Sequence, residues 1–295
     1  MDRMTEGIAG TGFVTRRAAM AGMAACAVPA RAPALGQGGF RFGLTPVFLD
    51  NDWQLLELIR AHVREAAGLD LSFVQRRTYK EVVALLLVGE IEAAWLCGWP
   101  LLQYPSRMTP LALPVWQGAP LYQSYLIAAE DRDADGLADL RGDIHAYSDP
   151  DSNSGYLVTA SELVAMGERP EAFFSRSFFT FGHRNVVRAV ARRLAQSGSV
   201  DGYVYEALAV MEPELVARTR VVWRSEWFGF PPVAVPSAAS DTPTVRQFAR
   251  ALFGMEATGP GREALWLLQL DGFAPPEPGA FDSIAVRMAR LADRG

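Results

Sequence analysis

The residues best suited to chemistry lie between Ser148 and Val158, where the chain reads SDPDSNSGYLV. Ser152, Asn153 and Ser154 are residue types that cap a helix, because their side chains accept its unpaired N–H groups. The remaining N–H groups and the positive end of the helix dipole favour an anion in front of the helix. The segment is therefore either an ordinary strand–turn–helix junction or an anion-binding loop.

The same serines raise the possibility of a catalytic triad, since His183 and Asp201 follow them along the chain. A Ser–His–Asp set can act as nucleophile, base and orienting group. This order matches none of the usual hydrolase arrangements, and a capping serine spends its lone pairs on backbone N–H groups. We expect a binding protein rather than an enzyme, with a hydrolase as an alternative.

Other catalytic and cofactor motifs are missing from the sequence. It contains neither GxxxxGK[ST] nor GxSxG, and the N-terminal GIAGTG follows no strand. The histidines, His62, His145 and His183, lack the spacing of metal ligands. We expect His62 on an exposed helix face, His145 as a structural residue in a strand, and Cys97 as a small buried hydrophobe. No metal and no cofactor are predicted.

Composition narrows the class of protein further. Half of the 295 residues are apolar, which is enough for a large core or two modest ones. No uninterrupted apolar run approaches the roughly 20 residues of a membrane-spanning helix. The net charge is -5 and the body of the chain has no basic cluster, so nucleic acid is not an expected partner.

Residues 1–36 have the pattern of an export signal. Twin arginines, Arg16 and Arg17, precede a weakly apolar stretch that ends in small residues, as in a Tat signal. We therefore expect a cleaved signal and a periplasmic protein. The alternatives are a disordered, alanine-rich N-terminus and lipid anchoring at Cys26, whose preceding residues faintly resemble a lipoprotein cleavage box.

From residue 40 the chain alternates strand-like and helix-like segments, which predicts an α/β fold with parallel strands. A first unit has predicted strands at 40–47, 69–75, 91–98, 110–116 and 121–130, with helices at 52–68 and 78–90. A second has strands at 143–148, 173–181 and 219–225, helices at 137–142, 154–167 and 183–198, and a strand turning into a helix at 200–211. A strand at 231–235 and helices at 242–254, 261–270 and 281–293 complete the chain.

This order predicts two α/β lobes, one inserted into the other. Residues 37–122 and 223–295 form the first lobe and residues 123–222 the second. The crossings are expected near Tyr122–Ala128 and Val221–Arg224. A cleft between two such lobes is a common ligand site, and it closes by a hinge motion.

Five segments in register resemble the periplasmic phosphate/phosphite/phosphonate-binding proteins of ABC importers, the PhnD-like family. They are TYKEVVALLLVGEIEAAW, GAPLYQSYLIA, SDPDSNSGYLV, GHRNVVRAVARRLAQSGSVDGYVYEAL and RVVWRS followed by FGFPPVAV. The resemblance runs from about residue 40 to residue 273 and implies a type II periplasmic-binding-protein fold.

The resemblance also implies a set of ligand-binding residues. Ser152, Asn153 and Ser154 become the oxyanion loop, and Tyr79 donates its hydroxyl from the other lobe. His183 donates to the oxyanion or to a ligand tail, and Asp201 orients a side chain or accepts from a protonated ligand oxygen. Asn153 stands where the family commonly has Thr.

Aromatic residues complete the implied pocket: Trp99, Tyr125 and Tyr203. Trp99 is the candidate pocket indole, Tyr125 lies in the segment that matches the crossing strand, and Tyr203 occupies a stretch where aminoalkylphosphonate binders carry carboxylates. The aromatic walls argue against 2-aminoethylphosphonate and suit a bulkier or quaternary-ammonium ligand.

The expected protein is a monomer that delivers a small oxyanion to an inner-membrane ABC permease. The alternative partner is a signalling protein that reads the closed form of a sensor module.

Overall fold

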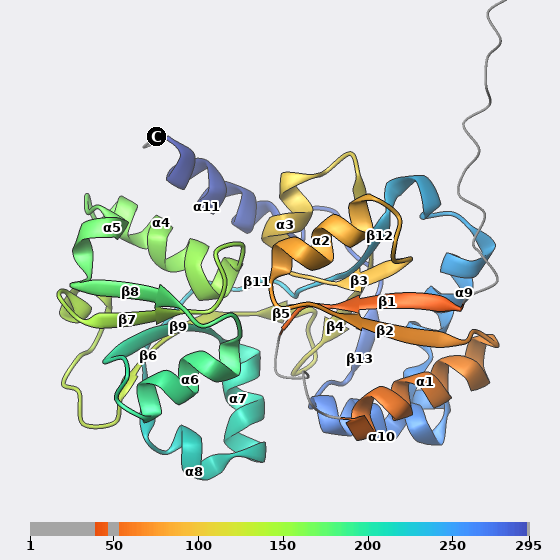
Figure 1. The fold of residues 1–295 in the computed structure, drawn as a ribbon, viewed down its shortest axis with the longest axis horizontal. Coiled ribbons are helices and arrows are strands. Elements are labelled where there is room, and N and C mark those ends of the chain that lie inside the picture. The colour runs from red at the N-terminus through yellow and green to blue at the C-terminus, as the bar shows by residue number, and fades with distance from the viewer. Residues whose placement is uncertain (1–38, 47–52, 294–295) are drawn as a thin grey trace, which may run out of the picture. The chain divides into compact units, whose positions relative to one another are not determined.

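Two separate β-sheets organise the chain (Figure 1). The computed structural model describes residues 39–46 and 53–293, which fall within one compact unit at residues 36–295. The predicted export signal, including Cys26, lies outside the described residues.

The first sheet has six strands in the order β13-β4-β12-β3-β1-β2. In that order the strands are Gly272–Ala274, Met108–Val115, Val233–Pro236, Ala93–Trp95, Phe40–Leu44 and Leu71–Gln75. β1 pairs in parallel with β2 and β3, whereas β12 runs antiparallel to β3 and β4. The helices of this six-stranded lobe are α1 (Trp53–Ala67), α2 (Tyr79–Leu87), α3 (Gly98–Gln103), α9 (Pro243–Phe253) and α10 (Gly259–Leu268).

The second sheet has five strands in the order β10-β6-β9-β7-β8. They are Thr219–Arg224, Ser124–Ala129, Ser197–Asp201, Ile144–Tyr147 and Arg176–Phe179. The helices of this five-stranded lobe are α4 (Val158–Ala165), α5 (Pro170–Phe173), α6 (His183–Ala191), α7 (Gly202–Met211) and α8 (Pro213–Val216). Short 3-10 turns occur at Leu137–Leu140 here, and at Ser237–Ala239 and Met255–Ala257 in the other lobe.

A two-stranded ribbon marks the passage between the lobes. β5 (Leu121–Tyr122) pairs antiparallel with β11 (Phe228–Gly229), and β6 and β10 continue from them into the five-stranded sheet. The predicted division at residues 222/223 falls inside β10, so the return crossing lies farther on, at residues 225–227. The last helix, α11 (Asp282–Ala292), packs against α3 of one lobe and α4 of the other.

Local sequence signals explain where several helices begin. Thr78 caps α2 in a capping box with Glu81, and Thr242 and Thr258 cap α9 and α10. α6 ends at Ala191 rather than at the predicted residue 198, because Arg193 adopts a positive φ of 61° and the chain then enters β9.

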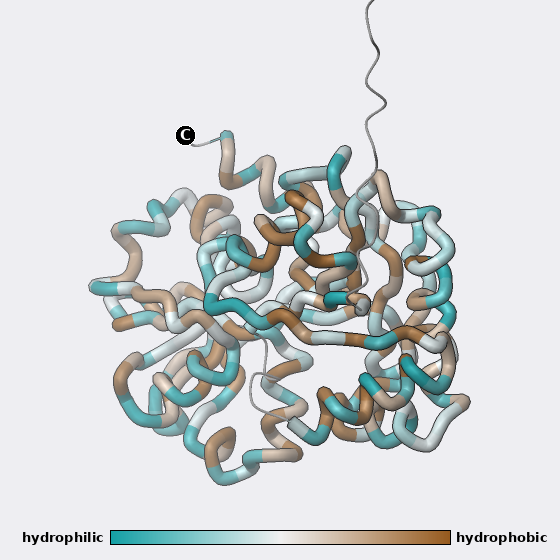
Figure 2. Tube along the Cα trace, turned by 45° about the vertical axis from the view of Figure 1, so that its right-hand side comes forward, coloured by the Kyte–Doolittle hydropathy of each residue, from teal (hydrophilic) through white to brown (hydrophobic). Residues whose placement is uncertain are grey.

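Hydrophilic and hydrophobic residues alternate along the helical coils of the chain (Figure 2). His62 shows that a polar residue can lie on the inner face. The prediction of an exposed His62 is wrong: the side chain is buried against α9 and α10, where Nδ1 contacts the Thr258 hydroxyl at 2.8 Å and Nε2 contacts the Ala251 carbonyl at 2.8 Å. Of the helices in the described part of the chain, none has the length and apolar character to span a membrane.

Candidate ligand-binding site

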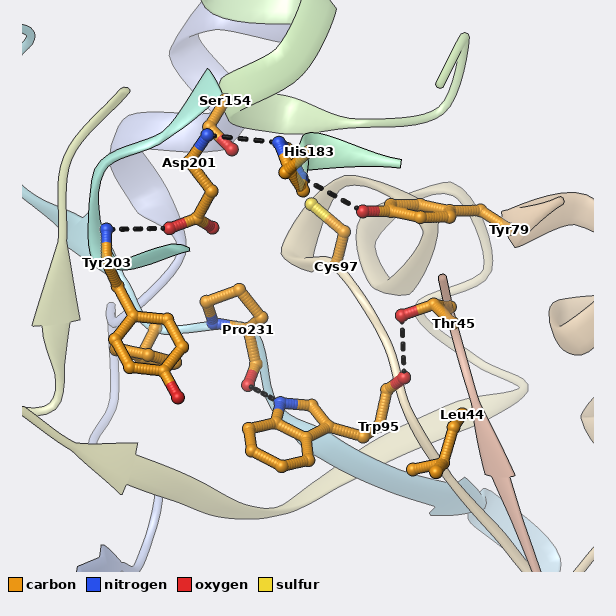
Figure 3. Close-up of a pocket in the computed structure, with 11 residues that line it drawn as sticks. Leu44, Thr45, Tyr79, Trp95, Cys97, Ser154, His183, Asp201, Tyr203 and Pro231 are labelled. Carbon is orange, nitrogen blue, oxygen red and sulfur yellow. Dashed lines mark hydrogen bonds between the residues drawn. The ribbon is translucent and has the colours of Figure 1, made fainter. Parts of the chain in front are cut away.

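A pocket lies between the two lobes, and both contribute to its wall (Figure 3). The cavity is small, about 20 Å³. Its lining residues come from four stretches of the six-stranded lobe and three of the other: Leu44, Thr45, Tyr79, Trp95, Cys97, Phe230 and Pro231, and then Ser154, His183, Asp201 and Tyr203.

The fold brings these residues together because strands of both sheets end at the pocket. Thr45 follows β1, Cys97 follows β3, and Asp201 ends β9. The first residue of α2 is Tyr79 and the first residue of α6 is His183. Ligands of open α/β sheets bind at this edge, beyond the carboxyl ends of parallel strands.

The 148–155 loop folds tightly back on itself. The Ser148 N–H donates to the Gly155 carbonyl at 3.2 Å, and the Ser152 hydroxyl accepts the Gly155 N–H at 3.0 Å. A Cβ at Gly155 would lie 1.7 Å from the Ser148 hydroxyl, so only glycine fits. A π-helical turn at Asn153–Leu157 follows and runs directly into α4. Ser152 is therefore a helix cap, and Ser154 is the loop hydroxyl that reaches the pocket.

A hydrogen-bonded chain links His183 to both lobes. Its Nδ1 accepts the backbone N–H of Asp201 at 3.0 Å, and its Nε2 lies 3.2 Å from the hydroxyl of Tyr79. Burial lowers the pKa of His183 to about 3, so the ring is neutral at pH 7. Since Nδ1 accepts, the proton is on Nε2, which donates to the Tyr79 oxygen. The Tyr79 hydroxyl proton is thereby left for another acceptor, and the Ser152 side chain, which is hydrogen-bonded to Tyr79, is one within the protein.

Asp201 is a buried acid at the polar end of the pocket. Its Oδ1 accepts the N–H groups of Tyr203 at 2.9 Å and Val204 at 3.3 Å, which caps α7. Burial raises the pKa of Asp201 to about 7, and hydrogen bonds from Val204, Tyr203 and the Ser154 hydroxyl oppose that rise. Asp201 can therefore hold or release a proton near neutral pH.

Charge is scarce in the rest of the pocket. Among the described residues that line it there is no Arg or Lys, and Asp201 is the one acid. The side-chain donors at the polar end are neutral hydroxyl groups, and the neutral His183 imidazole is engaged with Tyr79. The opposite end is built from the side chains of Leu44, Trp95 and Pro231 (Figure 3), and Phe230 also lines the pocket. The pocket thus offers neutral donors at one end and an apolar wall at the other.

Asn153 faces the other lobe rather than the pocket. Its backbone N–H donates to the Cys97 sulfur at 3.2 Å, and its Nδ2 donates to the Tyr122 hydroxyl at 2.9 Å. Cys97 is buried, as predicted, and burial raises its pKa to about 11, so the thiol stays protonated. A further contact between the lobes joins the Tyr79 N–H to Asp149 Oδ2 at 3.2 Å.

The predicted aromatic residues take three different places. Tyr203 lines the pocket with its ring. The hydroxyl of Tyr125 donates to Glu206 at 3.2 Å, outside the pocket wall. Trp99 stacks on Tyr156 with ring centroids 6.1 Å apart, because the chain enters α3 directly after Cys97. The pocket indole is Trp95 instead, held by a 2.9 Å hydrogen bond to the Pro231 carbonyl.

Sequence reasoning did not select Leu44, Thr45, Trp95, Phe230 or Pro231 as site residues. Thr45 and Trp95 stand at the carboxyl ends of predicted parallel strands, which is a usable signal for such positions. Phe230 and Pro231 directly follow β11 at the end of the return crossing, more than a hundred residues after Trp95. No local sequence pattern marks them as site residues.

The catalytic triad does not form. His183 receives the backbone N–H of Asp201, not its carboxylate, and its other nitrogen faces Tyr79 rather than a serine. His145 is structural, as predicted, with both nitrogens on serine hydroxyls of β9 at 2.9 and 2.8 Å. Within the described residues, no three His, Cys, Asp or Glu side chains lie together as metal ligands would.

Comparison with known proteins agrees with this architecture. A curated relative, the phosphate-import protein PhnD of Mycolicibacterium smegmatis, is 27% identical over 177 residues, which are 56% of this chain and 55% of that protein. The chain thus matches about half the length of this relative.

Two solved structures share the fold. A binding protein component of an ABC phosphonate transporter from Pseudomonas aeruginosa is 20% identical, with a TM-score of 0.75 over 87% of this chain and 88% of that one. PhnD1 from Prochlorococcus marinus, in complex with methylphosphonate, is 13% identical, with a TM-score of 0.74 over 86% and 98% of the two chains. The type II periplasmic-binding-protein fold expected from the sequence is confirmed.

The profile of one protein family matches residues 42–280, which are most of the chain. Only the two ends of the described region lie outside this match. It is the profile of the periplasmic substrate-binding proteins of phosphonate ABC transporters. With two lobes around a pocket of neutral donors, this chain belongs to that family.

Proposed function

We propose that the protein binds a small, singly charged tetrahedral oxyanion in the interlobe pocket and delivers it to an ABC permease. Hydrogen phosphite, dihydrogen phosphate and the monoanions of short alkylphosphonates are of this class. The observation that carries the proposal is the chain from Asp201 through His183 to Tyr79, which turns the Tyr79 hydroxyl proton away from His183, toward the Ser152 hydroxyl or a bound oxyanion.

The preference for a single charge follows from Asp201. With no Arg or Lys among the described lining residues, a fully ionised dianion beside an ionised Asp201 carboxylate has nothing to offset the repulsion. One proton shared between Asp201 and the ligand removes that repulsion and forms a charge-assisted hydrogen bond. The pKa of about 7 at Asp201 makes that proton available at neutral pH.

The apolar wall supports a short and uncharged substituent on the ligand. The carboxylate of Glu206 accepts from Tyr125 outside the pocket, so an ammonium tail finds no acid in the wall besides Asp201. We expect 2-aminoethylphosphonate to bind more weakly than methylphosphonate.

A thermal-shift and calorimetric panel tests the proposal. The ligands are phosphate, phosphite, methylphosphonate, 2-aminoethylphosphonate, sulfate and methanesulfonate at pH 7. A ligand at about 100 times its Kd adds about 2.7 kcal/mol to the free energy of unfolding. Sulfate is a dianion without a proton of its own at pH 7, so it depends on a protonated Asp201 and should shift the melt less than phosphate. If no oxyanion shifts the melt, the pocket is not an oxyanion site; if sulfate matches phosphate, the preference for a single charge is wrong.

The proposal also covers the cellular location, the oligomeric state and the partner of the protein. We propose that the protein acts outside the cytoplasm as a monomer, after export, and that its partner is an inner-membrane permease. Neighbouring permease and ATPase genes are the expected genomic context. A neighbouring histidine kinase gene without a permease would instead favour the sensor alternative.

A further inference from the structure

Arg287 forms the most extensively bonded ion cluster among the described residues, and it lies outside the pocket. The side chain comes from α11 and is only 7% exposed. Its Nε and Nη2 bind the two carboxylate oxygens of Glu226 at 2.9 and 2.5 Å. Its Nη1 donates to the Ser161 hydroxyl at 2.9 Å and also pairs with Glu162.

The partners of Arg287 belong to two elements that matter for the site. Glu226 lies in the return crossing between β10 and β11, where the chain passes from one lobe to the other. Ser161 and Glu162 lie on α4, which continues from the turn that carries Ser154. In Figure 1, α11 lies beside α4 on one side and α3 on the other.

The bonding pattern is directional. A guanidinium offers planar, paired donors that fit a carboxylate in one orientation, and a lysine ammonium cannot reproduce them. Because the cation is buried, its charge must be balanced by these carboxylates. The paired hydrogen bonds from Arg287 to Glu226 are called the fork below. Loss of the fork leaves the crossing and α4 without a common anchor. The guanidinium also lies 6.0 Å from the ring of Phe228, the first residue of β11.

We propose that Arg287 is a positioning residue for the pocket. It clamps the return crossing to α4 and so holds Ser154 and the five-stranded lobe in the closed, ligand-gripping arrangement. The consequence for ligand affinity rests on the proposed function, whereas the consequence for lobe closure does not. Without the fork, the crossing and α4 move independently and the lobes open more widely.

Binding by matched variants tests the first consequence. Arg287→Gln removes the cation, and Arg287→Lys keeps the charge but loses the fork. The control is Arg290→Gln, which removes the same charge one turn along α11, where the side chain is 39% exposed and 4.0 Å from Glu162. With the oxyanion found by the panel, both Arg287 variants should raise Kd about tenfold through a faster off-rate, with the ligand order unchanged. Arg290→Gln should stay within twofold.

Lobe separation is the readout that a merely structural residue would not change. Val88 and Leu194 are 69% and 66% exposed and belong to different lobes. Spin labels on Val88→Cys and Leu194→Cys, in a Cys26→Ser background, report the distance between the lobes without any ligand, and the buried Cys97 stays unlabelled. Arg287→Gln should give a longer and broader distance distribution than Arg290→Gln.

The outcomes separate the two hypotheses. A variant that melts earlier but keeps the wild-type distances and Kd would overturn the positioning role. If no oxyanion binds the wild type, the proposed function fails while the label distances still decide the role of Arg287. Should Arg287→Gln fail to fold, Glu226→Gln breaks the same fork from a side chain that is 44% exposed, and the same distances apply.

Discussion

The hydroxyl of Tyr203 donates to the backbone carbonyl of Leu268 at 2.6 Å, and this bond joins the two lobes directly. Tyr203 lies in α7 of the five-stranded lobe and Leu268 ends α10 of the six-stranded lobe. The ring of Tyr203 lines the pocket while its hydroxyl is engaged with the other lobe. The side chain therefore connects the pocket wall to the contact between the lobes.

Tyr203→Phe should weaken ligand binding through closure alone, since the ring that lines the pocket remains. Loss of one neutral hydrogen bond costs about 0.5–1.5 kcal/mol, which is roughly a two- to tenfold increase in Kd. The matched control is Tyr205→Phe, because the Tyr205 hydroxyl bonds Thr219 within its own lobe at 3.1 Å. Stopped-flow measurement of the off-rate checks the prediction, and equal off-rates for the two variants would refute it.

Tyr79→Phe should weaken ligand binding more than Tyr203→Phe, because it removes a hydroxyl that lines the pocket and that the proposed oxyanion would accept from. A hydrogen bond to a charged group contributes about 1.5–3 kcal/mol, or roughly 10- to 150-fold in Kd. Burial already raises the pKa of Tyr79 well above its usual value, so the hydroxyl is a neutral donor at any physiological pH. Calorimetry of Tyr79→Phe beside Tyr125→Phe, whose hydroxyl lies outside the pocket wall, measures the difference. Similar losses in both variants would place the donor elsewhere.

The polar end of the pocket could be predicted from the sequence because its residues follow strands. Ser154, His183 and Asp201 each stand at a junction between a strand and a helix, and parallel strands bring such junctions to one edge. The predicted βαβ order is compatible with these positions, and it was the family resemblance that selected the three residues as one site. The family resemblance added Tyr79, which the lobe closure then brings to His183.

The apolar wall and the details of the loop could not be predicted, for identifiable reasons. Trp95 rather than Trp99 lines the pocket because a six-residue helix begins at Gly98, too short to leave a periodic pattern. The residue types allowed any of Ser152, Asn153 and Ser154 as the cap, and the close packing of the 148–155 loop on Gly155, which selects Ser152, leaves no pattern in the sequence. His62 is buried by helices that come about two hundred residues later.

Asp201→Asn should change how stability depends on pH while keeping the helix cap, since Asn also accepts N–H groups at a cap. Burial raises the folded-state pKa of Asp201 from 3.8 to about 7, so between these values the folded protein binds a proton that the unfolded chain has lost. The contribution of Asp201 to stability is therefore complete below about pH 4. It declines by at most about 1.4 kcal/mol per pH unit up to about pH 7.

His183 works in the opposite direction over much of this range. Its folded-state pKa is about 3 against 6.5 when unfolded, so its contribution is present above pH 6.5 and is lost as the pH falls toward 3. The two slopes oppose each other in the wild type. In Asp201→Asn the His183 slope remains, so the unfolding free energy should rise more steeply between pH 4 and 6.5 than in the wild type. Urea unfolding of both proteins at intervals of half a pH unit, without ligand, measures this, and parallel curves would show that Asp201 does not titrate near neutrality.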